Sequence, residues 1–435
     1  MLHSIEWYVC PSSWYVHLVL SIAGIAVDIE TIRKHFPALT ACSSSARHTI
    51  YFDNAAGTQV PRQCIERMTD YLLTSNANTG GVFPTARRSD ALLGESRAAV
   101  ADLLGAASPR EVTFGANMTT LTQAFARAFG RSCQPGDEIV TTRLEHEANV
   151  SPWLGLAERG VRVRFADIRT EDATIDLDSL ANQLSERTRL VAVGYASNAF
   201  GTVNPVARIA EMAHSAGALC FVDAVHFVPH GPVDVGTLGC DVLVCSAYKF
   251  FGPHVGILWG RADVLEQVQA FHLRTVKAEI PDKFESGTQN HEGIAGTLGS
   301  IEYLASLAPV GTTRREQLHK ALADIADYER TLSVTLLSLF ERLPYITVHG
   351  ITDRTQITRR VPTFAVTVTG HAPRDVATHL AGAGINVWSG NYYALEPMVR
   401  LGLEARGGAV RISLVHYNTL DEIAVLGDAL EQLAS

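Results

Sequence analysis

The sequence predicts an α/β fold, with a large domain built on a mainly parallel β-sheet and a smaller C-terminal α+β domain. The first observation is a strand–helix–strand unit: an apolar run at Leu190–Ser197, helical spacing at Val206–Ala216, and a second apolar run at 219–222. Such units favour parallel strands joined by right-handed crossovers. The second observation is a change of character near Thr312, where a long helical segment is followed by shorter strands and helices. That pattern is typical of an α+β domain.

The chain is long enough and apolar enough for two folded domains. It has 435 residues, of which 47% are hydrophobic and 19% are charged, as in ordinary globular proteins. Its formal net charge is −9. Nucleic acids and anionic membranes are bound by basic surfaces, so we expect neither of them to be a partner.

Four segments are expected along the chain. They are an extension of uncertain status (1–27), a helix and linker that join the small domain (28–47), the large domain (48–295) and the small domain (296–435). The apolar run Trp14–Ala26 lies in the extension, but no Lys or Arg precedes it and it is too short to span a bilayer. We therefore favour an extension without a catalytic role over a signal peptide. Asp28 is the expected N-cap of the first helix.

The cysteines and histidines do not form a metal or disulfide pattern. No CxxC pair occurs among the seven cysteines, which are Cys10, Cys42, Cys64, Cys133, Cys220, Cys240 and Cys245. This usage favours a reducing, cytoplasmic setting. His226, His230 and His254 lie near one another in the chain, but no acidic residue joins them. We therefore expect no metal site.

Residues 112–129 predict an anion site. Val112–Phe114 is expected to be a strand, residues 115–120 a turn of mostly small and polar residues, and Leu121–Phe129 a helix. Free backbone N–H groups and the helix dipole face the same point at such a turn. Many α/β proteins have a turn of this kind, so the motif alone is weak.

An acid and a lysine follow two neighbouring strands. The run 219–222 ends at Asp223, and the run 242–245 leads through Ser246 to Lys249. Parallel strands bring their carboxyl ends to one edge of the sheet. A lysine and a carboxylate at this edge suit pyridoxal 5'-phosphate (PLP), because the amine forms a Schiff base and the carboxylate keeps the pyridine nitrogen protonated. For such a pair alone, a solvated ion pair is the commoner explanation.

A helix is expected at 293–307, and the pattern of the chain changes after it. A stripe of apolar residues at helical spacing, which ends near Leu343, predicts a long helix whose buried face serves packing: Leu318, Leu322, Ile325, Tyr328, Leu332, Leu336 and Phe340. The remaining expected elements are a strand at Pro362–Val368, a helix at Pro373–Ala383, strands at Ile385–Trp388 and Val410–Leu414, and a terminal helix from Asp421.

The string Ser-Ala-Tyr-Lys-Phe-Phe-Gly-Pro at residues 246–253 directly follows an apolar strand and precedes a glycine-rich one, Val255–Gly260. Here the sequence resembles the class V aminotransferase family, the PLP-dependent fold type I group that contains the cysteine desulfurases. The resemblance covers roughly residues 28–430 and rests on several separate motifs. It implies PLP as the cofactor and an amino acid as the substrate.

The resemblance also implies roles for individual residues. The Glu-His-x-Ala-Asn string at 145–149 looks like the family segment whose histidine stacks on the cofactor, here His146. Asn198 matches a position that contacts the cofactor and the substrate carboxylate. With Lys249 and Asp223, the implied cofactor-binding residues are Asn117, Met118 and Thr119 at the phosphate turn, then Ser246, Tyr248, His226 and Thr288. His226 stands where desulfurases usually have glutamine, and Tyr248 where they usually have histidine.

Two further matches concern the substrate and the partner subunit. Arg411, in the string Val-Arg-Ile-Ser-Leu at 410–414, resembles the family arginine that holds the substrate carboxylate. A structural salt bridge is the alternative role. The Gly-Thr pair at Gly287–Thr288 resembles a loop that reaches the neighbouring subunit's phosphate, which implies a homodimer with a shared active site.

One departure from the desulfurases bears on the reaction. Their loop cysteine, which carries the persulfide, aligns most simply with Tyr393, and no cysteine follows Cys245 in the chain. Persulfide chemistry needs a reachable thiolate. We therefore expect a C–S or β-lyase reaction without an enzyme persulfide, with Tyr393 near the substrate. A class V aminotransferase, an epimerase and a non-catalytic binding relative remain as alternatives.

Overall fold

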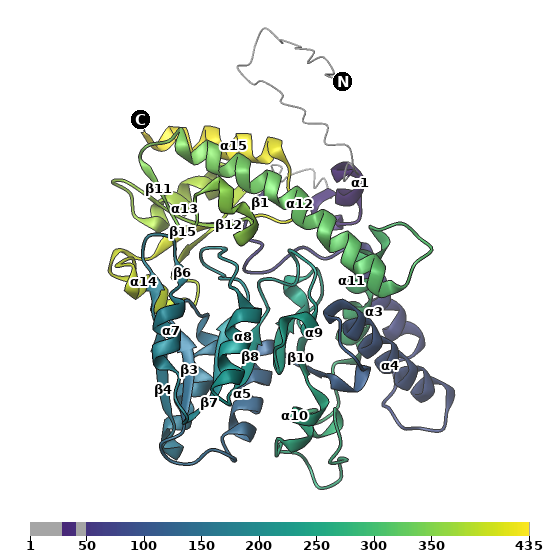
Figure 1. Cartoon of the computed structure of the whole chain (residues 1–435). Coiled ribbons are helices and arrows are strands. Elements are labelled where there is room, and N and C mark those ends of the chain that lie inside the picture. Colours follow the sequence, from purple (N-terminus) through teal and green to yellow (C-terminus); the bar gives the residue numbers. More distant parts are fainter. Residues whose placement is uncertain (1–27, 41–48, 435) are drawn as a thin grey trace, which may run out of the picture.

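The computed structural model describes residues 28–40 and 49–434. They form a seven-stranded sheet, a four-stranded sheet and two two-stranded sheets, with helices packed around them (Figure 1). The expected extension at 1–27 and most of the expected linker lie outside the described residues. Near the described N-terminus, Asp28 caps α1 (Ile29–Lys34) by accepting a 3.2 Å hydrogen bond from the Thr31 amide.

The central sheet has seven strands in the order β2-β10-β9-β8-β7-β3-β4. Only β10 is antiparallel to its two neighbours, and the other neighbouring strands run parallel. The prediction of an α/β fold with a mainly parallel sheet is thus confirmed. The strands are β2 (Val112–Gly115), β3 (Glu138–Thr142), β4 (Arg162–Ala166), β7 (Thr188–Gly194), β8 (Leu219–Asp223), β9 (Val242–Ser246) and β10 (Gly256–Gly260).

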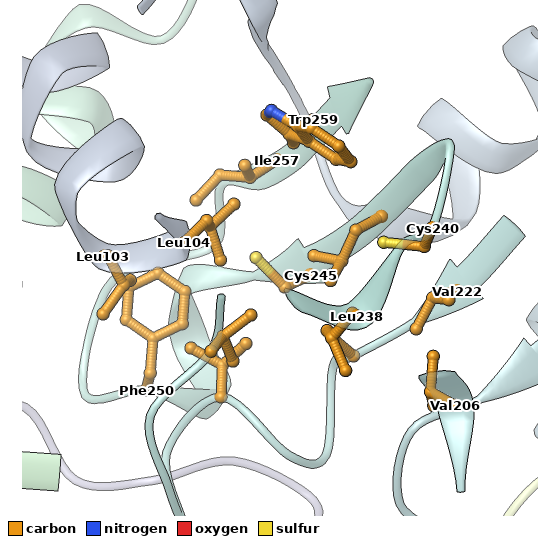
Figure 2. Packing of buried hydrophobic residues seen from close by; sticks show 14 of the residues in the cluster. Leu103, Leu104, Val206, Val222, Leu238, Cys240, Cys245, Phe250, Ile257 and Trp259 are labelled. Carbon is orange, nitrogen blue, oxygen red and sulfur yellow. The ribbon is translucent and has the colours of Figure 1, made fainter. Parts of the chain in front are cut away.

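Both faces of this sheet are covered, because alternate side chains of each strand pack into different cores. On β8, Cys220 and Val222 join a core that also contains α8 (Val206–Ser215), whereas Phe221 joins a core with α5 (Met118–Phe129). Figure 2 shows part of the first core, where strand side chains meet Leu103 and Leu104 of α4 (Pro84–Leu104). Burial on both faces explains why the strands appear as continuous apolar runs.

The second sheet is antiparallel, in the order β11-β12-β15-β14. Its strands are β11 (Ile346–His349), β12 (Thr363–Val368), β14 (Trp388–Gly390) and β15 (Ala409–Ser413), and its core includes residues of α13 (Pro373–Gly382) and α15 (Leu420–Glu431). The expected single strand Ile385–Trp388 is instead two strands. Its first part, β13 (Ile385–Asn386), pairs with β1 (Ile50–Tyr51), and Trp388 pairs with β15.

The long helix α12 (Arg314–Glu341) passes from one core to the other (Figure 1). Leu318 and Leu322 pack in the core of the central sheet, and Leu332 and Leu336 pack in the core of the second sheet. The apolar stripe expected from the spacing is therefore the face through which α12 joins both cores. The boundary at residue 295 stays a prediction.

Two features differ from the sequence-based expectation. The helix expected from Leu121 starts at Met118, because the Asn117 side chain accepts a 2.9 Å hydrogen bond from the Thr120 amide and caps it. Two helices without a prediction, α3 (Arg62–Thr74) and α4, flank α11 (His291–Ser306). The packing of α3 on α11 depends on Gly299, where a Cβ would lie 2.5 Å from the Gln63 carbonyl oxygen.

Candidate active site

Lys249 and Asp223 lie at the same edge of the central sheet. Asp223 ends β8 and pairs with Val244 of β9, and Lys249 follows β9 in the 3₁₀ helix η4 (Ala247–Lys249). The half-buried Lys249 Nζ donates hydrogen bonds to the carbonyl oxygens of Ala55 and Ala56, the latter at 2.9 Å. Burial and the Arg411 guanidinium lower the pKa of Lys249 to about 7. Much of this amine is therefore neutral near pH 7, as a nucleophile must be.

Asp223 is buried and oriented by the backbone that follows it. Its Oδ1 accepts a 2.9 Å hydrogen bond from the Val225 amide. Burial raises the pKa of Asp223 to about 6, although the nearby Lys249 opposes this shift. A cation placed beside a buried carboxylate of this kind stabilises its charged form.

Glu145, which had no predicted role of its own, lies in the same buried region. Thr142 donates a 2.6 Å hydrogen bond to Glu145 Oε1, and the Asn149 side chain donates a 2.8 Å bond to Oε2. Burial, with a further contribution from the negative charge of Asp223, raises the pKa of Glu145 to about 8. It therefore carries a proton over most of the neutral range.

His146 and Tyr393 face each other at the mouth of the site. Nδ1 of His146 accepts a 3.0 Å hydrogen bond from the Ala148 amide, and its ring centroid lies 5.7 Å from that of Tyr393. Burial and the positive charge of Lys249 lower the pKa of His146 to about 4, so its ring is neutral. Tyr393 is 73% exposed, and its carbonyl oxygen accepts a 2.7 Å hydrogen bond from the Glu147 amide.

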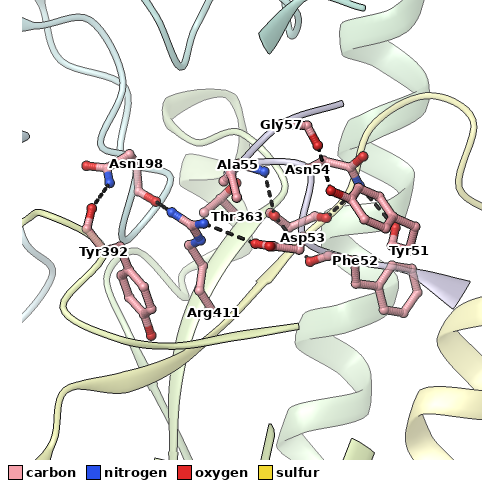
Figure 3. A network of polar contacts seen from close by, with 12 residues as sticks. Tyr51, Phe52, Asp53, Asn54, Ala55, Gly57, Asn198, Thr363, Tyr392 and Arg411 are labelled. Atoms are coloured by element: carbon pink, nitrogen blue, oxygen red, sulfur yellow. Dashed lines mark hydrogen bonds and ion pairs between the residues drawn. The ribbon is translucent and has the colours of Figure 1, made fainter. Parts of the chain in front are cut away.

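Arg411 is the centre of a buried polar network with Asp53 and Asn198 (Figure 3). Nη2 of Arg411 lies 3.1 Å from Asp53 Oδ1, and Nη1 donates a 3.2 Å hydrogen bond to the Asn198 carbonyl oxygen. Asn198 Nδ2 in turn donates a 2.9 Å bond to the Tyr392 carbonyl. Arg411 Nε and Asn198 Oδ1 have no partner among the described residues.

The partner of Arg411 was not predicted. The string around it, Asp-Asn-Ala-Ala at 53–56, does not by itself indicate a role for Asp53. The ion pair of Asp53 with Arg411 joins β15 to the segment after β1.

The expected phosphate turn is closely packed against the sheet. The Met118 amide donates a 2.9 Å hydrogen bond to Ser246 Oγ, which ties the first turn of α5 to the end of β9. Gly256 of β10 lies under the turn, and a Cβ there would be 2.3 Å from the carbonyl carbon of Asn117. The Asn117 side chain is occupied by capping, and Thr119 lies in the first helical turn, where amides lack intrahelical acceptors. Because the Met118 and Thr120 amides already donate to Ser246 and Asn117, the Thr119 amide is the one that this helical turn offers to an anion.

The remaining predicted residues differ in their surroundings. His226 is buried, its Nε2 lies 3.0 Å from Thr363 Oγ1, and burial, aided by neighbouring cations, holds its pKa well below the usual range. The Tyr248 ring stacks on His254, with centroids 5.0 Å apart. Thr288 lies on an exposed segment before α11. Arg411 lies in the middle of β15, and the other predicted residues except Thr288 come from strand ends, their adjacent turns and the 391–394 loop.

No cysteine of the described chain offers a reactive thiolate. Burial raises the pKa of each of the five buried, free thiols, which are Cys64, Cys133, Cys220, Cys240 and Cys245. Cys10 and Cys42 lie outside the described residues. Within residues 28–40 and 49–434, no three His, Cys, Asp or Glu side chains are grouped as a metal ion would require.

Comparisons with known proteins identify the family. The family described as Aminotransferase class-V matches residues 50–426. The chain belongs to this family. A cysteine desulfurase of Pectobacterium atrosepticum is 32% identical over 425 residues, covering 94% of this chain and 98% of the relative. The aminotransferase-like protein FGM3 of Gibberella zeae is 31% identical over 425 residues, covering 95% of this chain and all of the relative.

A solved structure supports the fold assignment. The apo cysteine desulfurase of Thermococcus onnurineus superposes with a TM-score of 0.83 at 28% identity, covering 95% of this chain and 99% of that one. Class V aminotransferases and cysteine desulfurases depend on PLP, so this chain is a PLP-dependent enzyme of fold type I.

The residues present fit this cofactor. A buried carboxylate with a raised pKa, Asp223, is available to the pyridine nitrogen, and Lys249 has a lowered pKa that suits attack on an aldehyde. The turn before α5 comes close enough to β10 that only glycine fits at position 256. Two unpartnered polar atoms, Arg411 Nε and Asn198 Oδ1, remain for a carboxylate and an amine.

Proposed function

We propose that this PLP-dependent enzyme cleaves a C–S bond or another β-substituent bond of an amino acid, without a persulfide on the enzyme. The observation that carries the proposal is that the segment 387–394 contains no cysteine, while Lys249 and Asp223 are both present. We take Tyr393 to stand where the desulfurases have their cysteine. The described cysteines are buried, so none of them is suited to receive sulfur from a substrate.

Arg411 and Asn198 are the proposed carboxylate-binding residues. Both Nη atoms of Arg411 already have oxygen partners, and its Nε is buried without one. A substrate carboxylate that accepts from Nε would satisfy a donor whose burial otherwise costs about 1–3 kcal/mol. Asp53 fixes the guanidinium plane and thereby the direction from which the carboxylate binds.

Lys249 is the proposed attachment point and proton carrier. PLP, when bound, supplies an aldehyde for the amine and an electron-withdrawing ring that stabilises negative charge at the substrate α-carbon. Nζ of Lys249, with a pKa of about 7 in this structure, is suited to accept and return a proton at neutral pH. His146 would stack on the ring, and Asp223 would hold a proton on the pyridine nitrogen. Tyr393 would cover the substrate or donate a proton to the leaving group.

The second candidate is an aminotransferase. A relative of similar identity is named aminotransferase-like, whereas others are named cysteine desulfurase. Transamination uses the same lysine, carboxylate and arginine, but needs a keto-acid acceptor in place of a leaving group. Both reactions occur on this fold, so the fold does not distinguish the two activities.

The proposal includes partners and location. We infer a homodimer whose active sites include Thr288 of the neighbouring chain, and a cytoplasmic location. Among the helices of the described ranges, none has the length and apolar character that crossing a bilayer requires.

Two measurements test the proposal. Purified protein should show a visible absorption band that borohydride abolishes and that Lys249→Ala lacks, whereas the exposed-lysine control Lys277→Ala should keep it. The protein is then incubated with a panel of L- and D-amino acids, with and without a keto acid, and sulfide, pyruvate and amino transfer are scored together.

We expect pyruvate or a related keto acid to form without an acceptor. Keto-acid-dependent amino transfer alone would favour the second candidate, and a persulfide trapped on a cysteine by alkylation and mass spectrometry would contradict the first. The same panel run on Tyr393→Phe tests the proton-donor role. Proton donation requires the hydroxyl, so the variant should lose activity if Tyr393 is the donor. Covering the pocket requires only the ring, so activity should persist if that is its role.

A further inference from the structure

The structure contains a polar cavity that none of the proposed active-site residues lines. Its volume is about 100 Å³, several times the roughly 30 Å³ that a water molecule occupies in the liquid. It is bounded by the hairpin of β5 (Ile168–Arg169) and β6 (Thr174–Ile175), by residues 202–205, and by the 3₁₀ helix η6 (Arg354–Arg359). None of these residues has a role in the proposed reaction.

The charged residues that line this cavity are all positive. Arg169 and Arg359 line it, and no Asp or Glu does. Within the described chain neither arginine forms an ion pair; Arg359 only donates a 2.6 Å hydrogen bond to Gln356. Near Arg169 in the chain, Asp167 forms an ion pair with Arg400, and Asp172 accepts from the Thr174 amide and hydroxyl. Asp176 caps α7 (Leu177–Gln183), and Glu171 does not line the cavity. The cavity therefore favours an anion.

Two buried polar atoms at the cavity lack partners. Thr202, which is 1% exposed, and Asn204 both line it, and neither Thr202 Oγ1 nor Asn204 Oδ1 has a hydrogen-bond partner among the described residues. The two residues are two positions apart on an extended stretch with single β-bridges, so their side chains project to the same side. Buried polar atoms without partners are rare and call for an explanation.

The orientation of Asn204 identifies what its free atom needs. Its Nδ2 donates a 2.8 Å hydrogen bond to the Gly194 carbonyl oxygen, so the atom without a partner is the amide oxygen, which can only accept. A ligand that satisfies this cavity carries negative charge for the two arginines and a hydrogen-bond donor for Asn204.

We propose that this cavity binds a small oxyanion that retains a proton, of the hydrogen phosphate type. Arg169 and Arg359 neutralise its charge, the Thr202 hydroxyl donates to one of its oxygens, and Asn204 Oδ1 accepts from its O–H group. Phosphate carries a proton at neutral pH and sulfate does not, so the site should prefer phosphate. The proposal does not depend on the reaction at Lys249.

The cavity lies where residues 202–203 contact residues 359–360, so an oxyanion bound there would connect these two segments. The Val203 amide donates a 2.8 Å hydrogen bond to the Arg359 carbonyl oxygen, and Thr202 forms a β-bridge with Arg360. The oxyanion would add a second connection at this seam, between the stretch that follows Asn198 and the segment that enters β12.

The test is calorimetric titration of inorganic phosphate into the PLP-loaded protein, at constant ionic strength and pH 7. Loading with PLP fills the other candidate phosphate site, the turn before α5. We expect saturable binding at one site per chain. The double variant R169Q/R359Q should weaken it by at least about tenfold, a loss of about 1.4 kcal/mol. The matched control R274Q/R342Q removes the same charge from exposed arginines elsewhere and should bind as the wild type does.

Two further arms separate binding from folding. Thr202→Val keeps the side-chain volume and removes a hydroxyl that has no partner, so the melting temperature without phosphate should not fall, while phosphate affinity should drop several-fold. Sulfate should bind at least about tenfold more weakly than phosphate. Absence of saturable binding, or unchanged binding by R169Q/R359Q or Thr202→Val, would overturn the site, and equal affinity for sulfate would overturn the role of Asn204.

Discussion

The amine of Lys249 differs from an ordinary lysine because of where its side chain lies. Burial and the Arg411 guanidinium both disfavour the ammonium form, and Asp53 and Asp223 only partly offset them, so its pKa is about 7. An unperturbed lysine has a pKa near 10.4 and is almost entirely protonated at neutral pH. The network that positions Arg411 therefore also makes Lys249 reactive.

We predict that cofactor-free protein reacts with PLP at a rate that depends on this pKa. The rate constant should rise about tenfold per pH unit below pH 7 and level off above it, because only the neutral amine attacks. Arg411→Met removes a positive charge and should move the midpoint upward, whereas the control Arg411→Lys keeps the charge and should move it less. Stopped-flow absorbance measures the rate, and a midpoint near 10 in the wild type would contradict the prediction.

Glu145 should make stability depend on pH. Its pKa is about 8 in the folded protein, mainly because of burial, and near 4.3 in an unfolded chain. The folded state therefore binds more protons between these values, and stability falls as pH rises through this range. Glu145→Gln cannot ionise, so its melting temperature should change less between pH 6 and 9 than that of the wild type. An equally steep decline in both proteins would show that another group is responsible.

The sequence located some site residues and missed others for a physical reason. Asp223 ends a strand, and Lys249 and His146 follow within a few residues of strand ends. The edge of a parallel sheet brings such residues together. Asp53 and Glu145 act through tertiary contacts: Asp53 pairs with Arg411, which is far along the chain, and Glu145 depends on burial near Asp223. Neither contact can be inferred from the residues that are adjacent in the sequence.

The turn before α5 requires glycine at one position of the neighbouring strand. It lies on β10 at Gly256, where any Cβ would come within 2.3 Å of the Asn117 backbone. A side chain there must displace the turn that offers the Thr119 amide to the anion. Position 256 therefore links the packing of the sheet to cofactor affinity.

We predict that Gly256→Ala weakens both stability and PLP binding. Overpacking of this kind typically costs about 1–3 kcal/mol, and displacement of the Thr119 amide should raise the dissociation constant for PLP. The control is Gly94→Ala at an exposed position of α4, where nothing lies within 4 Å of the new Cβ and alanine should stabilise the helix by up to about 1 kcal/mol. Thermal unfolding and PLP titration are measured for both variants, and a Gly256→Ala protein with wild-type affinity would contradict the prediction.

Strong periodicity explains which elements were predicted. The buried strands and α12 have clear apolar patterns, and the structure contains them. Helices α3 and α4 were missed although both begin next to a proline, Pro61 and Pro84. Their buried positions are mainly small or polar residues, including Ser89, Ser96 and Ala99. Small residues allow helices to pack closely, but they do not produce the apolar periodicity from which a helix is predicted.

Large apolar side chains are exposed at the end of α3 and in the segment that leads into α4. Leu73 of α3 is 78% exposed and Val82, in the segment before α4, is 84% exposed. Phe83 is also exposed. Large apolar side chains grouped on a surface are typical of interfaces. With the exposed position of Thr288, this supports the proposed homodimer, in which each active site needs a loop from the other chain.

Mixed dimers test this arrangement directly. Lys249→Ala removes the attachment point, and Thr288→Asp places a negative charge where the neighbour's phosphate would bind; each variant alone should lack the PLP absorption band. If the sites are shared, a heterodimer contains one site with both residues intact, and random reassortment should restore about a quarter of the wild-type band. If both residues serve the same chain's site, no site is intact and nothing is restored. Native mass spectrometry confirms that heterodimers form, so their formation without recovery of the band would contradict the shared site.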